Sequence, residues 1–209
     1  MTNPTGAIQI LAHEGRRVTV QRRTRETDIT MTLDLDGTGR AEIATGIGFL
    51  DHLLTSLAHH AIFDLDIRAQ GDLHIDEHHT AEDVALVLGW ALAEALGDRG
   101  GIVRFGEASV PMDESIATAV VDVGGRPYAL IDLPFRAERI GALSTQLVEH
   151  ALESFARTSG TTLHLRGTGR NDHHLAEAAF KALARALRAA VVADPRRAGG
   201  VASTKGSLG

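Results

Sequence analysis

Two pairs of adjacent histidines, each followed by a glutamate, carry the most direct chemical signal in this sequence. On a helix, the first histidine of a pair and the glutamate four residues later share one face, because about 3.6 residues complete a turn. The second histidine points about 100° around the helix axis. The two neighbours of a pair are therefore expected to reach different metal ions. The residues concerned are His78, His79 and Glu82, and then His173, His174 and Glu177.

Two further histidines complete a set of eight residues that divides evenly into two possible metal sites. His52 and His150 each lie near the start of a helix expected before one of the pairs. Together the residues predict two metal sites, each built from three imidazoles and one carboxylate. Such a donor set leaves positions open on an octahedral ion, as catalysis requires. Nitrogen and oxygen donors admit manganese, iron, zinc or nickel, and the spacing does not choose among them.

The alternative for a single pair is a solvated surface feature or a simple His–Glu contact on a helix. The duplication of the whole pattern favours metal binding. The chain has 11 histidines and no cysteine, which excludes disulfides, thiolate metal sites, iron–sulfur clusters and a cysteine nucleophile. Five histidines have no repeat partner and are expected at the surface or in supporting positions. They are His13, His59, His60, His74 and His164.

Composition narrows the class of protein. The 209 residues are 44% hydrophobic and 23% charged, which is typical of a globular domain with a sizeable core. The formal net charge of −6 argues against a nucleic-acid-binding protein, which would normally carry a basic patch. Charges interrupt every long apolar run, so we expect no membrane span. A cytoplasmic location is the expectation.

The elements that must position the histidines follow from hydrophobic periodicity. The first 15 residues predict a loose arm or an early strand. We expect a strand over 29–35, a hairpin turn over 36–39, a partner strand over 41–45, a helix around 50–57, a strand over 63–67 and a helix over 78–96, ending at Gly97. We then expect strands over 116–123 and 128–133 around a turn, a helix over 143–158, a strand over 161–166 and a helix over 172–192.

The second series repeats the first in letters as well as in order. Residues 49–56 (FLDHLLTS) align with 147–154 (LVEHALES), and 78–82 (HHTAE) align with 173–177 (HHLAE). We therefore predict an α+β fold of two duplicated halves, each a small, mostly antiparallel sheet covered on one face by helices. The whole chain is expected to form a single domain over 1–209. Its pseudo-repeats span about 18–100 and 101–193, and a C-terminal tail spans 194–209.

Signals for phosphate binding are weaker than those for metal. There is no Walker loop, and the glycine-rich strings around Thr38 and Thr168 are best read as turns. Basic residues could nevertheless gather around an anion if the fold brought them together. The candidates are Arg104, Arg126, Lys181 and Lys205.

Several motifs together resemble the imidazoleglycerol-phosphate dehydratase family. They are TGIGFLDH (45–52), HHTAED (78–83), PMDE (111–114), GRP (125–127), HHLAE (173–177) and STKG (203–206). The resemblance runs from about Arg22 to the C-terminus. One departure is Gly124, where the family more often has serine, and a turn should tolerate the difference.

The resemblance implies a manganese-dependent hydro-lyase of histidine biosynthesis, with two Mn²⁺ ions per active site and a fold like that of ribosomal protein S5 domain 2. It implies assembly into 24 subunits built from trimers, with active sites at subunit contacts. The implied metal ligands are His52, His78, His79, Glu82, His150, His173, His174 and Glu177. The implied substrate contacts are Glu26, His52, Arg104, Arg126, Lys181, Ser203 and Lys205. Glu26, Glu82 and Glu177 are the implied catalytic residues, with Glu26 as the candidate general acid or base.

Two other classes of function remain open from the residues alone. A metal-dependent hydrolase would use an open-site ion to activate water. A non-catalytic, metal-assembled shell protein would instead show closed coordination and no turnover. Neither explains Glu26, the basic residues and the Ser-Thr-Lys-Gly tail together. Residues 111–114 (PMDE) have no role from spacing, and a strand end or an interface suits them as well as a site.

Overall fold

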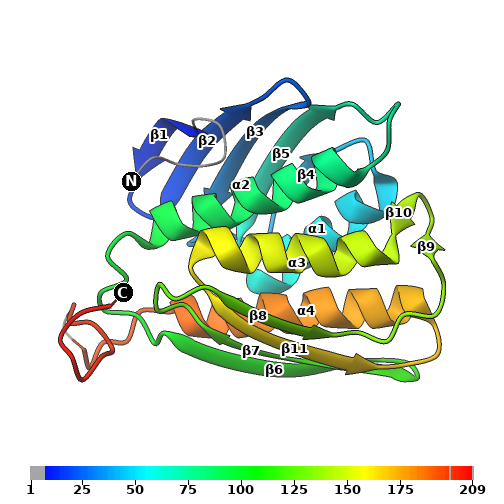
Figure 1. Cartoon of the computed structure of the whole chain (residues 1–209). Coiled ribbons are helices and arrows are strands. Elements are labelled where there is room, and N and C mark those ends of the chain that lie inside the picture. Colours follow the sequence, from blue (N-terminus) through cyan, green and yellow to red (C-terminus); the bar gives the residue numbers. More distant parts are fainter. Residues whose placement is uncertain (1–7, 198, 209) are drawn as a thin grey trace.

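The computed structural model describes residues 8–197 and 199–208. Its four helices form a central layer between two β-sheets, as Figure 1 shows. Within this layer α2 packs against α3, and α1 packs against α4. The first sheet receives α2 on its inner face, and the second sheet receives α4. The expected α+β fold, with each sheet covered on one face by helices, is confirmed.

The first sheet has five strands in the order β1-β2-β3-β5-β4. Their bounds are β1 Ile8–Glu14, β2 Arg17–Arg23, β3 Thr27–Asp34, β4 Ala41–Ala44 and β5 Asp64–Gly71. Alternate residues of β3 are buried, among them Ile29, Met31 and Leu33, so one face of this sheet contributes to the core. Of the two alternatives for the N-terminal segment, the strand is correct over Ile8–Glu14, and residues 1–7 lie outside the described part.

The second sheet has four strands in the order β6-β7-β11-β8. Their bounds are β6 Phe105–Met112, β7 Ser115–Asp122, β8 Tyr128–Asp132 and β11 Thr162–Thr168. A separate two-stranded ribbon joins β9 Arg139–Ile140 to β10 Leu143–Ser144. The strand order β2-β3-β5-β4 of the first sheet matches β6-β7-β11-β8 of the second, so the repeat seen in the sequence is also a repeat of topology.

The predicted hairpin between residues 29–35 and 41–45 is wrong. In the first sheet β5 lies between β3 and β4, antiparallel to β3 and parallel to β4. The same arrangement recurs in the second sheet, where β11 separates β7 from β8. The connection over 36–40 therefore bridges a gap of one strand. The Asp64 carboxylate holds it in place, accepting hydrogen bonds from the backbone N–H groups of Thr38 (2.7 Å) and Arg40 (3.0 Å).

The helices agree closely with the periodicity. Their bounds are α1 Gly48–Ala61, α2 His78–Leu96, α3 Thr145–Ser159 and α4 Asp172–Val191. Gly97 follows α2 with a positive φ of 54°, as expected of a C-terminal glycine. Asn171 caps α4 by accepting hydrogen bonds from the backbone N–H groups of His173 and His174. Each His-His pair therefore lies in the first turn of its helix.

Three strands were missed. The short β9 and β10 were not expected, and β10 occupies the first two residues of the helix expected over 143–158. β6 was not expected either, although its last residues, Pro111 and Met112, belong to the string suspected of ending a strand. No helix within residues 8–197 and 199–208 is long and apolar enough to cross a membrane.

Candidate metal centres and active site

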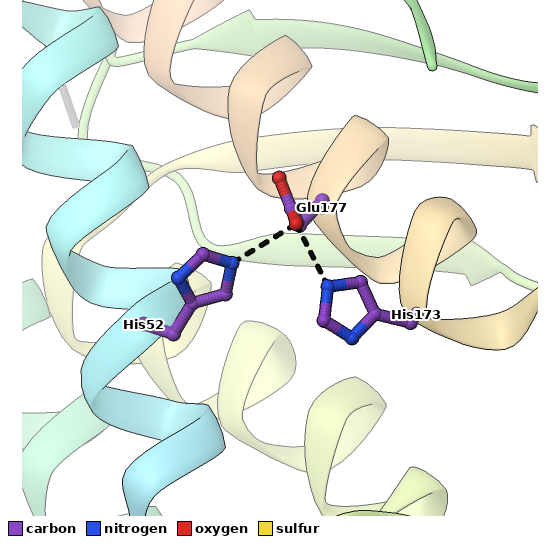
Figure 2. Close-up of side chains that lie close together, drawn as sticks. All are labelled: His52, His173 and Glu177. Atoms are coloured by element: carbon purple, nitrogen blue, oxygen red, sulfur yellow. Dashed lines mark hydrogen bonds and ion pairs between the residues drawn. The ribbon is translucent and has the colours of Figure 1, made fainter. Parts of the chain in front are cut away.

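One cluster of ligand-type side chains joins α1 to α4. The Nε2 atoms of His52 and His173 each lie 2.9 Å from the same carboxylate oxygen, Oε1 of Glu177 (Figure 2). His173 and Glu177 share a face because they are four residues apart on α4. His52 reaches them from α1 because α1 packs along α4.

The second oxygen of Glu177 has a cationic partner. Lys181, one turn further along α4, places its Nζ 2.6 Å from Oε2. Burial favours the neutral acid, but Lys181, His52 and His173 outweigh it and lower the pKa of Glu177 to about 2. Glu177 is therefore an anion at neutral pH, as a metal ligand must be.

A second cluster joins α2 to α3. Nε2 of His78 lies 3.9 Å from Oε2 of Glu82, and Nε2 of His150 lies 3.3 Å from Oε1. Arg157, on α3, approaches the same Oε1 to 3.3 Å. The two clusters are related by the repeat. Each combines a histidine–glutamate pair from one half with a single histidine from the other half.

The donors of both clusters suit a metal ion. In each, two imidazole nitrogens and one carboxylate oxygen lie within 4.8 Å of one another. Apart from its approach to Glu82 Oε1, the buried His150 Nε2 has no hydrogen-bond partner within the described residues, so no further group competes with a cation for this nitrogen. The sets contain nitrogen and oxygen donors, which manganese and other borderline or hard divalent ions accept.

The second histidine of each pair, termed here the outward-facing histidine, contacts different residues from the first. Its ring plane is nearly perpendicular to that of its neighbour, at 81° for His78 and His79 and at 83° for His173 and His174. The expectation that the two neighbours reach different partners therefore agrees with the geometry. His79 and His174 do not join either three-residue cluster of the described chain.

A carboxylate holds each outward-facing histidine. His79 Nδ1 lies 3.0 Å from Asp72 Oδ2, and His174 Nδ1 lies 2.9 Å from Glu114 Oε2. Those hydrogen bonds raise the pKa values of both histidines. The pKa of Glu114 is held well below its usual range, mainly by His174 and the backbone N–H of Asn171. A carboxylate on Nδ1 fixes the ring and directs Nε2 outward, as in metal sites where a histidine ligand has a carboxylate behind it.

Basic residues and the C-terminal tail enclose a separate cavity of about 310 Å³. Its polar lining includes Arg104, Arg126, Ser203, Thr204 and Lys205. Three of the four basic residues expected to gather around an anion are thus brought together. Lys181 is not among them, and its ammonium group contacts Glu177 in the α1–α4 cluster.

The fold and the paired clusters can be compared with known proteins. A model of the imidazoleglycerol-phosphate dehydratase family matches residues 45–187. The chain belongs to this family. The dehydratase of Gluconacetobacter diazotrophicus is 56% identical over 194 residues, which cover 92% of this chain and 98% of that protein. That of Acidiphilium cryptum is 55% identical over 194 residues, covering 92% and 99% respectively.

Solved structures of the family agree with the fold. The crystal structure of the dehydratase from Pyrococcus furiosus, in complex with (S)-C348, matches with a TM-score of 0.78 at 36% identity, covering 90% of this chain and 99% of that one. The dehydratase from Staphylococcus aureus gives a TM-score of 0.76 at 37% identity, covering 84% and 98%. The expected class of enzyme, a hydro-lyase of histidine biosynthesis, is confirmed by the family.

Glu26 lies beside the first outward-facing histidine. Its Oε1 is 3.8 Å from His79 Nε2, and about half of its side chain is exposed. It follows the end of β2 in the short connection to β3, where Thr24 Oγ1 accepts hydrogen bonds from the backbone N–H groups of Glu26 and Thr27. Glu26 is thus an accessible carboxylate next to a ligand-type imidazole.

Sequence reasoning missed the carboxylates behind the histidines. Glu114 belongs to the PMDE string whose role was open, and the structure shows that it contacts His174. Asp72 directly follows β5, and the structure shows that it contacts His79. The repeat of the histidines could have prompted a search for such partners, but they come from different elements in the two halves.

The remaining histidines lie outside both clusters of the described chain. His59 and His60 contact each other in the last turn of α1, and His164 contacts Tyr128 on the second sheet. His13 is an exposed residue of β1, and His74 is exposed before α2. Their expected surface or supporting positions fit this arrangement.

Proposed function

We propose that this protein carries out the manganese-dependent dehydration of D-erythro-1-(imidazol-4-yl)glycerol 3-phosphate. The products are 3-(imidazol-4-yl)-2-oxopropyl phosphate, known as imidazoleacetol phosphate, and water. The observation that carries the proposal is the duplicated pair of His–Glu–His clusters, each accompanied by a histidine whose Nδ1 is held by a carboxylate. A cytoplasmic location follows from the biosynthetic role.

Two Mn²⁺ ions per active site would be held by the eight residues expected from the sequence. Within one chain, His52, His173 and Glu177 converge, and so do His78, His150 and Glu82. Each set lacks the third imidazole that the sequence predicts. His79 and His174 can supply it to a neighbouring copy, because neither belongs to a cluster of its own chain and a carboxylate on Nδ1 leaves Nε2 as the donor. This geometry supports active sites at subunit contacts, in an assembly of 24 subunits built from trimers.

The substrate has no carbonyl group that would make the departing proton acidic, so the reaction needs another source of stabilisation. The hydroxyl to be lost is on the carbon beside the imidazole ring, and the proton comes from the next carbon. Bound Mn²⁺ would act as a Lewis acid on the ring and the hydroxyl groups. Loss of water leaves an enol, and return of a proton to the carbon beside the ring gives the ketone.

The chain's own residues would position the substrate and move its protons. Arg104, Arg126, Ser203 and Lys205 line the cavity suited to the phosphate. Fixing that end of the substrate limits the motion of the reacting carbons. Glu26 is the candidate acid or base because its exposed carboxylate lies beside a metal-type imidazole. Lys181 would act through Glu177, which it holds as an anion.

The test is to remove metal with a chelator and restore it with Mn²⁺ or, in parallel, with Mg²⁺. Imidazoleacetol phosphate and inorganic phosphate are both measured. We expect product formation to fall with metal removal and to return with Mn²⁺, with no phosphate release. Phosphate release would favour a hydrolase. Undiminished dehydration by metal-free protein, or metal binding without any turnover, would each contradict the proposal.

A further inference from the structure

Arg104 holds the C-terminal tail in place. Its guanidinium Nη1 donates to the carbonyl oxygen of Ala202 at 2.5 Å. Its Nε and Nη2 donate to the two oxygens of Asp122 at 2.7 and 2.8 Å. Three N–H groups of one rigid fork are thus used, two on a single carboxylate and one on the tail. Only about a tenth of the Arg104 side chain is exposed.

The backbone at Arg104 is strained in order to make this contact. Its φ of 79° is in the left-handed region, which non-glycine residues rarely adopt. Hydrogen bonds hold it there: its N–H donates to the carbonyl of Ala190, and its own carbonyl accepts from the N–H of Val123. The guanidinium also lies over the ring of Phe105, at 4.7 Å from the centroid. Interactions on several sides therefore fix one orientation of the guanidinium.

Gly124 makes room for the same arrangement. A Cβ atom at this position would lie 2.7 Å from Arg104 Nη2 and 2.7 Å from Asp122 Oδ1, closer than such atoms approach. A side chain here would require the ion pair to move. The sequence suggested only that a turn would tolerate glycine at this position. The structure shows a specific consequence, because Gly124 lets the Arg104–Asp122 pair lie against the loop after β7.

The tail beyond this contact forms one wall of the basic cavity. Ser203, Thr204 and Lys205 line it opposite Arg126, and the tail (red in Figure 1) lies beyond the C-terminal end of α4. Gly101 N–H also donates to the carbonyl of Gly200 at 3.0 Å. The Asp194 N–H in turn donates to the carbonyl of Gly101 at 2.8 Å. The tail is thus joined to the segment between the two halves at three points, and one of them depends on the Arg104 side chain.

We propose that Asp122 is a positioning residue for phosphate binding: it orients Arg104 to hold the tail at Ala202. Asp122 does not contact the phosphate itself. The inference rests on the proposed function in naming a phosphate ester as the occupant of the cavity. The anchoring of the tail does not depend on that identity.

The test compares Asp122→Asn with the wild-type holoenzyme. Asp132→Asn, which changes an exposed aspartate at the end of β8 in the same sheet, is the matched control. Deuterium exchange of tail amides is measured without ligand, and the Kd for inorganic phosphate is measured by titration. KM and kcat are then measured with imidazoleglycerol phosphate, together with the metal content and thermal unfolding temperature.

We expect faster exchange over residues 201–206 in Asp122→Asn. The phosphate Kd and the substrate KM should each rise by about tenfold, as loss of a bidentate charge-assisted contact would cause. Metal content should be unchanged and kcat should fall less than threefold. Wild-type tail exchange and phosphate Kd in Asp122→Asn would overturn the proposal, as would a fall in kcat with unchanged KM. Absence of turnover by the wild type would instead refute the proposed function. Deuterium exchange and phosphate titration would still test whether Asp122 and Arg104 hold the tail.

Discussion

The two His–Glu–His clusters come from one duplication, yet they differ in their surroundings. Glu177 has 9% of its side chain exposed and contacts Lys181 at 2.6 Å, whereas Glu82 has 26% exposed and contacts Arg157 at 3.3 Å. The two cations do not correspond in the repeat, because Lys181 follows its glutamate on the same helix and Arg157 lies on the neighbouring one. The two halves thus share the donors of the clusters and differ in the cations that neutralise the glutamates.

The largest expected effect comes from removing either glutamate ligand. Loss of residues behind metal ligands alone costs about 10–100-fold, so Glu177→Gln and Glu82→Gln should each lower kcat/KM by more than about 100-fold. Each should also bind one fewer metal ion per chain, measured by elemental analysis. Glu94→Gln, further along α2, is the control. Full metal content in either variant would contradict the assigned ligands.

The same two variants should differ in stability. Glu177→Gln leaves the ammonium group of Lys181 without its carboxylate in a largely buried site, and should lower the free energy of unfolding by about 3 kcal/mol. Glu82→Gln removes a more exposed ion pair, which contributes less than about 1 kcal/mol. Denaturant unfolding of metal-free protein measures both. Equal losses would show that the difference in burial between the clusters has no energetic consequence.

The next effect compares the carboxylates beside the two outward-facing histidines. Glu26 lies 3.8 Å from His79, and Asp113 lies 3.9 Å from His174. If Glu26 transfers a proton, Glu26→Gln should lower kcat by about 100–1,000-fold while retaining manganese. Asp113→Asn should change kcat less than threefold, because Asp113 is 80% exposed and Glu114 already holds His174. Wild-type kcat in Glu26→Gln would reject its role.

A smaller effect concerns how closely the helices of the two halves approach. Gly89 of α2 lies against α3, where a Cβ would be 2.4 Å from the carbonyl oxygen of Phe155. Gly89→Ala should therefore destabilise the fold by about 1–3 kcal/mol through overpacking. Its counterpart in the repeat is Ala184, and Ala184→Gly should cost about 1 kcal/mol from helix propensity. Denaturant midpoints compare the two, and a neutral Gly89→Ala would show that the helix crossing can relax.

The smallest expected effect is a difference in how stability depends on pH, at two residues that occupy equivalent positions at the start of a strand in each half. Asp64 of β5 accepts hydrogen bonds from the loop before β4, and Thr162 of β11 donates to the carbonyl of Arg126 in the loop before β8. The backbone N–H of Thr38 is the main cause of the lowered pKa of Asp64. A lowered pKa in the folded state gives stability that is present above the unfolded value of 3.8 and is lost as pH falls through the lower folded value.

Asp64→Asn should therefore cost about 1–2 kcal/mol near neutral pH, and this difference from wild type should shrink below pH 4. Thr162→Val should give a loss that does not change over the same pH range, since a hydroxyl does not titrate there. Unfolding measured from pH 7 to pH 3 decides the matter. A pH-independent deficit in Asp64→Asn would show that the charge of Asp64 is unimportant.

Much of this arrangement could be predicted from local patterns. The spacing of His78 and Glu82, and of His173 and Glu177, specified helix faces and gave helix bounds that agree with the structure. The strand neighbours could not be predicted in the same way. The turn at 36–39 looks like a hairpin locally, but β5 enters the gap only because α1 returns the chain to the sheet, and that is a property of tertiary packing.

The supporting residues were also beyond sequence reasoning. Nothing in the spacing of Asp72, Glu114 or Asp122 relates them to their partners, because each contact joins separate elements. From the sequence, Lys181 was expected to help bind an anion. It lies one helical turn after Glu177 on α4, and side chains at this spacing are neighbours on the helix surface, which explains its contact with the Glu177 carboxylate.

Each cluster combines residues from both halves, and this arrangement bears on how the protein arose. Each cluster needs one histidine from one half and a His–Glu pair from the other, so a half-length ancestor could not have closed either cluster by itself. Two copies of such a half, related by a twofold axis, would form both clusters at once. A single chain that carries both halves keeps this symmetric pair together at any protein concentration. It also allows the halves to differ: the first has an additional edge strand at Ile8–Glu14, and the second is followed by the tail.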